Sequence, residues 1–125
     1  MYTVSVEREF IAQHFLFGGD WGRENDPHAH HYVVEAQFRG KTLDEDGYLL
    51  DITVIEAFLD DMVSRYRDQM LNSLPEFSGL NPSIEHFSRI ICDDLATRLT
   101  GLPLDSIKVR VKENSIAWAS YTRKY

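Results

Sequence analysis

The chain has 125 residues, of which 43% are hydrophobic and 26% are charged, a balance typical of one ordinary globular domain. This composition excludes a disordered tail, a collagen-like rod and a disulfide scaffold, and no apolar run approaches the roughly 20 residues of a membrane span. The net charge of −7 argues against nucleic acid as the main partner, because phosphate binding requires a basic stripe. We therefore expect a single domain over residues 1–125 with a small-molecule partner.

The first part of the chain predicts two strands. Apolar and polar residues alternate over residues 2–14 and again over residues 28–39. A period of two is typical of a strand with one buried face. The segment 18–27 between them is rich in Gly, Asn, Asp and Pro, which predicts a loop.

The middle of the chain predicts two helices. Thr53 and Glu56 have the spacing of a capping box, and apolar residues follow at helical spacing as far as Met70. Asn81 and Pro82 together predict the start of a second helix, with Asn as the N-cap and Pro in the first position. An apolar stripe then continues toward Gly101.

Two further strands are expected at the end of the chain, over residues 107–112 and 116–120, where apolar residues alternate with polar ones. An antiparallel sheet with two helices on one face accommodates this order of elements most simply. The predicted fold class is therefore α+β.

The single cysteine, Cys92, cannot form an internal disulfide, which is typical of a reducing compartment. The N-terminal segment MYTVSVEREF contains neither a basic segment nor a long apolar one, so we expect no secretory signal. Both observations favour a cytoplasmic protein. Cys92 flanks the apolar stripe of the second predicted helix, so we interpret it as a small buried residue rather than as a nucleophile.

Three histidines share the apolar face of the first two predicted strands. His14 continues the apolar parity of the first strand, and His28 and His30 lie two residues apart on the second. Three neutral imidazoles suit Zn²⁺ and leave a fourth position open for water or substrate. The alternative is a polar strand edge without a metal. His31 and His86 are interpreted as surface residues.

Glu113 has the parity of the apolar residues in the third predicted strand, which directs its carboxylate inward. A buried carboxylate is costly unless it is paired or hydrogen-bonded. Glu113 is therefore a candidate acceptor for N–H groups of a ligand. The alternative is that the strand ends before Glu113, so that parity no longer matters.

Several short motifs together resemble the 6-pyruvoyl-tetrahydropterin synthase and 6-carboxytetrahydropterin synthase family. They are Phe10-x-Ala12-x-His14, His28-x-His30 with Tyr32-Val33-Val34, Gly47-x-x-x-Asp51, Leu71-Asn72, Asn81-Pro82-Ser83-x-Glu85 and Val111-Lys112-Glu113. The resemblance covers nearly the whole chain. It implies the tunnelling fold, in which three or six subunits close their sheets into a barrel, so a homo-trimer or homo-hexamer is expected.

The resemblance also implies a function and a set of site residues. The family depends on zinc and acts on 7,8-dihydroneopterin triphosphate. By this likeness His14, His28 and His30 are the zinc ligands. Glu113 resembles the carboxylate that anchors the pterin, and the backbone near Ser83 helps to hold the pterin ring.

The sequence departs from the family at three points. Glu24 stands where the family usually has a catalytic cysteine, and Ala29 replaces the glycine between the two histidines of the motif. The family's Asp-His pair falls on Arg67 and Asp68. The usual Cys-Asp-His proton relay is therefore missing, and Glu24 and Asp68 are the candidates to move a proton.

Three functions remain open from the sequence. The leading hypothesis is a zinc-dependent lyase acting on dihydroneopterin triphosphate or a related dihydropterin, including the 6-carboxytetrahydropterin product of the queuosine route. Glu24 also resembles the glutamate of a subgroup that cleaves the side chain to 6-hydroxymethyl-7,8-dihydropterin, a folate precursor. The third alternative is a pterin- or purine-binding protein that has lost catalysis.

Overall fold

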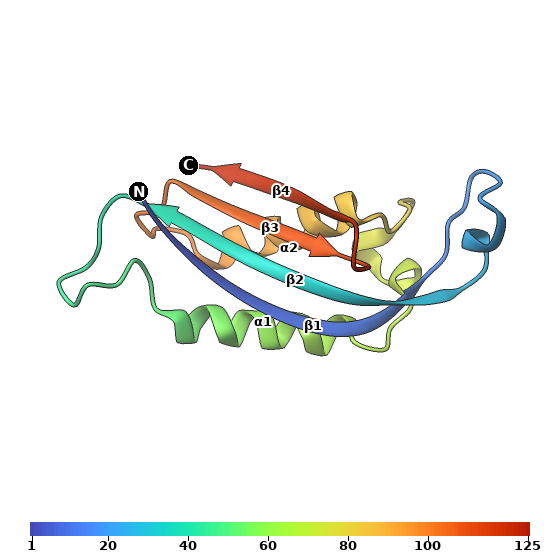
Figure 1. The fold of residues 1–125 in the computed structure, drawn as a ribbon, viewed down its shortest axis with the longest axis horizontal. Helices are drawn as coiled ribbons and strands as arrows, with labels where there is room; N and C mark the ends of the chain where they lie inside the picture. Colours follow the sequence, from blue (N-terminus) through green and yellow to red (C-terminus); the bar gives the residue numbers. More distant parts are fainter.

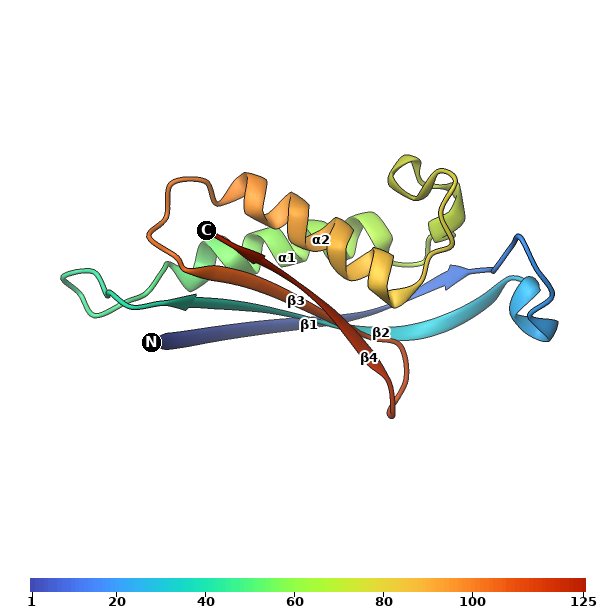
Figure 2. The ribbon, with the colours of Figure 1, turned by 90° about the horizontal axis from the view of Figure 1, so that it is seen from above.

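The computed structural model, which describes residues 1–125, has one antiparallel sheet in the order β1-β2-β3-β4 with two helices packed on one face (Figures 1 and 2). The strands are β1 (Tyr2–His14), β2 (His28–Gly40), β3 (Ser106–Lys112) and β4 (Trp118–Lys124). The helices are α1 (Ile52–Tyr66) and α2 (Ile84–Arg98), with short 3-10 turns η1 (Gly22–Asn25), η2 (Leu71–Ser73) and η3 (Pro75–Phe77). The predicted α+β architecture is confirmed.

The β1–β2 hairpin is longer than the rest of the sheet. Its pairing runs without interruption from Tyr2 opposite Gly40 to His14 opposite His28. Strand β3 pairs with β2 only as far as Val33, so the last residues of the hairpin have no third strand beside them. This end projects beyond the helices and carries the loop with η1 (Figure 1). We call it the open end of the hairpin.

Aromatic side chains fill the core directly beneath the open end. Phe10 and Tyr32 come from neighbouring strands, and their ring centroids lie 5.7 Å apart. Phe87 of α2 contacts Tyr32 edge-on at 5.3 Å, and Tyr66 of α1 contacts Phe87 at 5.0 Å. Buried aromatic pairs of this geometry contribute packing beyond their burial alone. These four side chains form a closely packed layer beneath the open end, which we call the aromatic floor.

The predicted start of the first helix is wrong in detail. Asp51 is the N-cap of α1, and its carboxylate accepts hydrogen bonds from the Thr53 amide at 2.9 Å and the Thr53 hydroxyl at 2.6 Å. Thr53 therefore serves as a partner of the cap rather than as the cap itself. Glu56 pairs instead with Arg8 of β1 at 3.3 Å. The helix also ends at Tyr66, before Met70.

The predicted cap of the second helix is also displaced. Ser83, not Asn81, is the N-cap of α2, and its hydroxyl accepts a hydrogen bond from the His86 amide at 3.1 Å. The Asn81 side chain is unavailable because it binds the backbone N–H and C=O of Phe17, at 2.9 and 3.1 Å. Pro82 consequently precedes the helix.

The last strand begins later than predicted. Ile116 lies in the connection before β4 and is 90% exposed. The reason is Asn114, whose side-chain oxygen accepts hydrogen bonds from the amides of Ile116 and Ala117, at 3.0 and 2.9 Å. These bonds fold the chain into a turn there.

Among the helices of the chain, none is long and apolar enough to cross a membrane.

Candidate metal centre

His14, His28 and His30 converge at the open end of the hairpin. His14 and His28 are directly opposite in the register, and His30 follows two residues later on the same face. The ring centroids lie 4.5 Å apart for His14 and His28, 4.7 Å for His14 and His30, and 4.9 Å for His28 and His30. The strand periodicity thus brings three imidazoles into one cluster on the helix-covered side of the sheet.

Backbone carbonyls orient two of these rings. Nδ1 of His14 lies 3.1 Å from the Pro82 carbonyl oxygen, and Nδ1 of His28 lies 2.8 Å from that of Asp26. A carbonyl only accepts hydrogen bonds, so each Nδ1 carries a proton, and in the neutral ring the lone pair then lies on Nε2. Such outer hydrogen bonds are typical of metal-binding histidines, because they fix the tautomer and the ring orientation.

His14 is held in its neutral form. It is almost completely buried, and its pKa falls to about 4, first because of burial and then because of repulsion from His30 and His28. The buried hydroxyl of Tyr32 lies 3.1 Å from its Nδ1. A neutral imidazole at neutral pH is the form that coordinates a metal.

Glu24 joins the histidines from η1. Its Oε2 lies 2.8 Å from Nε2 of His28. One donor atom from each of His14, Glu24, His28 and His30 lies within 4.8 Å of the others, and no other group of three or more His, Cys, Asp and Glu residues is arranged to hold a metal.

Nε2 of His28 is a buried atom without a hydrogen bond, despite its short distance to Glu24. The carboxylate oxygen therefore lies off the direction of a ring N–H. A buried polar atom without a partner requires an explanation, and a bound metal ion is one possible explanation. Three imidazoles beside a carboxylate are donors that zinc accepts in proteins, so these residues fit the metal that the sequence predicts.

Three asparagines fix the loop that carries Glu24. Asn72 accepts a hydrogen bond from the Phe15 amide and donates to the Phe15 carbonyl, at 2.9 and 3.0 Å, and Asn81 holds Phe17 in the same way. Asn25 donates to the carbonyls of Leu16 and Gly19, both at 3.0 Å, and accepts from Trp21 at 2.8 Å. Sequence reasoning did not find this role of Asn25, although its place beside Glu24 was a possible signal.

Glu113 and Ser83 border the histidines from two other elements. Glu113 follows the last residue of β3, and its side chain is 25% exposed, with Oε2 3.9 Å from Nε2 of His30. The strand therefore ends before Glu113, yet the carboxylate still faces the cluster. Ser83 follows Pro82, the residue whose carbonyl orients His14.

Asp68 lies apart from the cluster within the same chain. Its amide donates to the Ile11 carbonyl at 2.7 Å, and it lines a shallow hollow with Glu9, His31 and Arg67. Ile11 is three residues before His14, a separation of about 10 Å along a strand. Asp68 also has a left-handed backbone with φ of 61°.

The remaining candidates of the sequence analysis occupy structural or surface positions. Cys92 is buried, its Sγ faces the Ile107 carbonyl, and burial raises its pKa to about 11, so the thiol is inert at neutral pH. His31 is 59% exposed and lies 3.6 Å from Glu9. His86 is partly buried in the first turn of α2, where its Nδ1 lies 2.8 Å from the Asn81 carbonyl oxygen.

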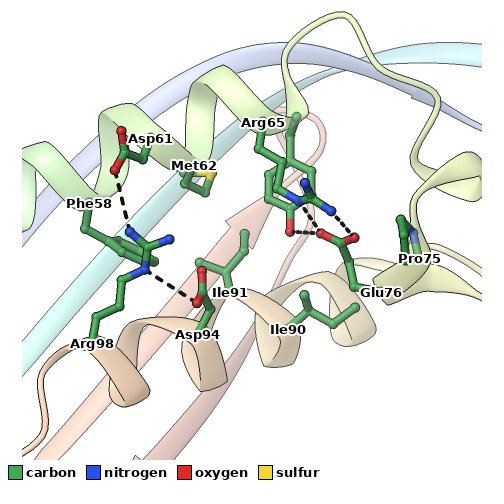
Figure 3. A pocket seen from close by; sticks show the side chains of 11 residues that line it. Phe58, Asp61, Met62, Arg65, Pro75, Glu76, Ile90, Ile91, Asp94 and Arg98 are labelled. Carbon is green, nitrogen blue, oxygen red and sulfur yellow. Dashed lines mark hydrogen bonds and ion pairs between the residues drawn. The ribbon is translucent and has the colours of Figure 1, made fainter.

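The largest pocket of the molecule lies elsewhere, between α1 and α2, with a volume of about 570 Å³ (Figure 3). Its charged side chains are already paired with one another. Arg65 binds Glu76 at 2.6 Å, and the Tyr66 hydroxyl donates to the same carboxylate at 2.8 Å. Arg98 pairs with Asp61 and Asp94, both at 3.5 Å. We call this region the helix groove.

Comparison with known proteins decides the family. The model of the family described as 6-pyruvoyl tetrahydropterin synthase matches residues 3–124. The chain belongs to the 6-pyruvoyl tetrahydropterin synthase family. It is 28% identical over 97 residues to a 6-pyruvoyl tetrahydrobiopterin synthase of Dictyostelium discoideum, covering 76% of this chain and 71% of the relative. It is 26% identical over 120 residues to a putative 6-carboxy-5,6,7,8-tetrahydropterin synthase of Archaeoglobus fulgidus, covering 96% and 95%.

Solved structures of this synthase family have the same fold. The 6-pyruvoyltetrahydropterin synthase of Plasmodium vivax, in a form with a catalytic glutamate replaced by alanine, matches with a TM-score of 0.82 and 16% identity over 99% of this chain and 98% of its own. The synthase of Caenorhabditis elegans matches with a TM-score of 0.81 and 21% identity over the same shares. The subunit architecture of the tunnelling fold that the sequence predicts is thus confirmed.

Proposed function

We propose that this protein is a zinc-dependent lyase that acts on 7,8-dihydroneopterin triphosphate or a closely related dihydropterin. Family membership supports a pterin synthase type of reaction. The observation that carries the proposal is the convergence of His14, His28 and His30 with the Glu24 carboxylate 2.8 Å from one of them. A metal site and a proton acceptor thereby occupy the same corner of the molecule.

His14, His28 and His30 would hold the zinc ion. His14 and His28 would bind it through Nε2, because their Nδ1 atoms face backbone carbonyls. When bound, zinc would lower the pKa of the substrate's side-chain hydroxyls and acidify the neighbouring C–H. The buried Tyr32 hydroxyl and the aromatic floor would exclude water from the side of His14. The histidines thus position the ion at the rim of the core.

Glu24 would act as the general base. Its side chain is about half exposed, so a substrate can approach it from the open side of the cluster. The Plasmodium vivax relative shows that a glutamate serves as a catalytic residue in one member of this fold. Proton acceptance by a carboxylate at this position would replace the cysteine that the sequence lacks.

Glu113 would anchor the substrate by accepting hydrogen bonds from the N–H groups of the pterin. A charged acceptor that is three-quarters buried forms strong hydrogen bonds with such donors. The backbone near Ser83 would hold the ring beside it. Asp68 remains a candidate for the second proton-transfer group, and because it lies away from the histidines within one chain, it would take part through a neighbouring subunit.

We also propose that the chain forms a homo-trimer or homo-hexamer in the cytoplasm. Strands β1 and β4 are the two outer strands of the sheet, and their outer edges are unpaired apart from a short bridge between Gln13 and Met70. Edges of this kind are available to pair with another copy. Sheets joined edge to edge would form the barrel of the tunnelling fold.

A second candidate reaction is favoured by Glu24 itself. In a retro-aldol cleavage, a base removes the proton of the outer side-chain hydroxyl, that carbon becomes the aldehyde of the departing triphosphate fragment, and the electron pair of the broken carbon–carbon bond passes into the C=N of the dihydropterin. The same base would then return the proton to the carbon that stays on the ring. Glu24 beside the metal cluster is suited to this proton transfer, and the product would be 6-hydroxymethyl-7,8-dihydropterin. The 6-carboxytetrahydropterin reaction is the corresponding alternative for a relative of the Archaeoglobus fulgidus protein.

Incubation of the zinc-loaded protein with dihydroneopterin triphosphate, followed by mass analysis of the products, tests this proposal. Loss of the triphosphate, a 6-carboxy product or a 6-hydroxymethyl product would each identify one lyase reaction. Tight binding of the substrate without any product would contradict the enzyme proposal and leave a pterin-binding protein. A Glu24→Gln variant provides the matched control for background hydrolysis.

A further inference from the structure

We infer that Glu24 is the fourth ligand of the metal while the site is free of substrate, and that the substrate displaces it. The carboxylate would then close the metal site at rest and become available as a base on substrate binding. This inference rests on the zinc site and the lyase function proposed above. It adds a role that proton transfer alone does not require.

Glu24 and His28 are in close contact without forming a hydrogen bond. Oε2 of Glu24 lies 2.8 Å from Nε2 of His28, yet it is outside the direction in which a ring N–H would point. A proton on Nε2 therefore does not bridge the two atoms, and at this distance they repel each other unless a cation lies where it attracts both. A metal bound to both atoms provides that cation.

Glu24 also completes the set of four metal donors that zinc requires. The three histidines alone leave one position of a four-coordinate zinc open. The carboxylate of Glu24 is the fourth donor within 4.8 Å of the others, whereas Glu113 lies 3.9 Å from His30 and does not belong to the set. The chain therefore supplies a complete coordination sphere by itself.

The loop holds the backbone of Glu24 in place before any substrate binds. The Glu24 carbonyl accepts a hydrogen bond from the Leu16 amide at 2.8 Å, and the neighbouring Asn25 is tied to the loop by three further hydrogen bonds. The backbone is thus fixed, while the side chain is 52% exposed and free to change its rotamer. A ligand on such a side chain can leave without any movement of the fold.

The inference also defines what a substrate must offer. A ligand that displaces Glu24 has to compete with a carboxylate already held beside the metal. Two adjacent hydroxyl groups that bind the ion together meet this demand better than a single donor, because the second contact forms at high effective concentration. Displacement of Glu24 should therefore favour a bidentate ligand over one with a single donor.

Zinc affinity provides the first test. We would equilibrate the wild type and Glu24→Gln with zinc and a competing chelator, with Glu9→Gln as the matched control because Glu9 also lies beside a histidine, 3.6 Å from His31. Glu24→Gln should bind zinc at least about 10-fold more weakly, the lower limit even for the loss of an outer partner. Glu9→Gln should match the wild type. Equal affinity of Glu24→Gln and the wild type would overturn the inference.

Imidazole added to the Co²⁺-loaded protein provides the second test, because this neutral probe binds only where a coordination position is open. The visible absorption of Co²⁺ should respond to imidazole at concentrations at least about 10-fold lower in Glu24→Gln than in the wild type. Equal responses would show that the fourth position is already open and would overturn the inference. Neither test uses a pterin, so a failure of the lyase proposal is recognised separately, while a wild type that binds no zinc would refute both.

Discussion

The open end of the hairpin and the helix groove both gather titratable side chains, but they satisfy them differently. In the groove, Arg65 and Tyr66 both donate to the Glu76 carboxylate, so charge and hydrogen-bonding capacity are balanced within the chain (Figure 3). At the open end, the imidazoles face the carboxylates of Glu24 and Glu113, but Nε2 of His28 has no hydrogen bond. The polar side chains of the groove are paired within the chain, whereas those of the open end leave a buried nitrogen without a partner, as the proposed metal site requires.

This contrast shows which feature marks a functional site. The pKa of Glu76 falls to about 2, chiefly because of its hydrogen bond to Arg65, which is a structural ion pair. The groove is also a pocket of about 570 Å³. Neither a shifted pKa nor a large volume therefore distinguishes the candidate site from the groove. The distinguishing feature is a set of metal-donor atoms that converge, one of which has no hydrogen-bond partner.

Removal of a histidine should have the largest effect. His28→Ala deletes one of the proposed zinc ligands, so zinc should fall from about one ion per chain to almost none, and turnover should disappear with it. Elemental analysis after gel filtration measures the metal content. His31→Ala is the matched control, since that side chain is exposed and lies on the other face of the sheet. Full zinc content in His28→Ala would refute the ligand assignment.

The next effect in size is expected from Glu24→Gln. This change keeps the size of the side chain but removes its capacity to accept a proton, so turnover should fall by about 10²–10⁴-fold. The rate is to be measured at saturating zinc, so that weaker metal binding does not contribute. An unchanged rate would transfer the role of base to Asp68, and Asp68→Asn would then be the variant to measure.

A smaller loss is expected from Glu113→Ala, in substrate binding rather than in metal content. Hydrogen bonds to a charged partner contribute about 1.5–3 kcal/mol, which corresponds to roughly a 10- to 150-fold increase in Kd. Fluorescence titration with a pterin measures this constant, and zinc analysis of the same sample checks that the metal remains. A Kd equal to that of the wild type would exclude Glu113 as the anchor.

The smallest effect is expected in the helix groove. Glu76 has a pKa of about 2 in the folded state, below its ordinary 4.5, so its contribution to stability is complete above about pH 4.5 and is lost as the pH falls toward 2. Because Arg65 is about half exposed, the contribution is screened to about 1 kcal/mol. Thermal unfolding should show Glu76→Gln less stable by about this amount at pH 7 and nearly equal at pH 2. A constant difference across this range would contradict the ion pair.

Much of the fold and the histidine cluster could be predicted from the sequence, because both follow from the period of two. The alternation over β1 and β2 directs His14, His28 and His30 to one face, and the antiparallel register then brings them together. The identity of the cap residues could not be predicted, because Asp51 and Ser83 compete with neighbours of equal propensity. Tertiary hydrogen bonds, such as that of Asn81 to Phe17, decide the outcome.

The position of Glu24 relative to the histidines could not be predicted from spacing either. It depends on Asn72, Asn81 and Asn25, which lie in different parts of the sequence and fix the loop through backbone hydrogen bonds. The separation of Asp68 from the cluster has a similar origin, since its amide is bound to Ile11 of β1. Periodic elements are therefore readable from sequence, and the loops between them are not.

The most direct test of the account is an anomalous diffraction map, recorded at the zinc absorption edge, from crystals of the substrate-free protein equilibrated with zinc. The account predicts one strong peak per chain, bounded by His14, His28, His30 and Glu24. A peak at any other position, or no peak among these four residues, would contradict it.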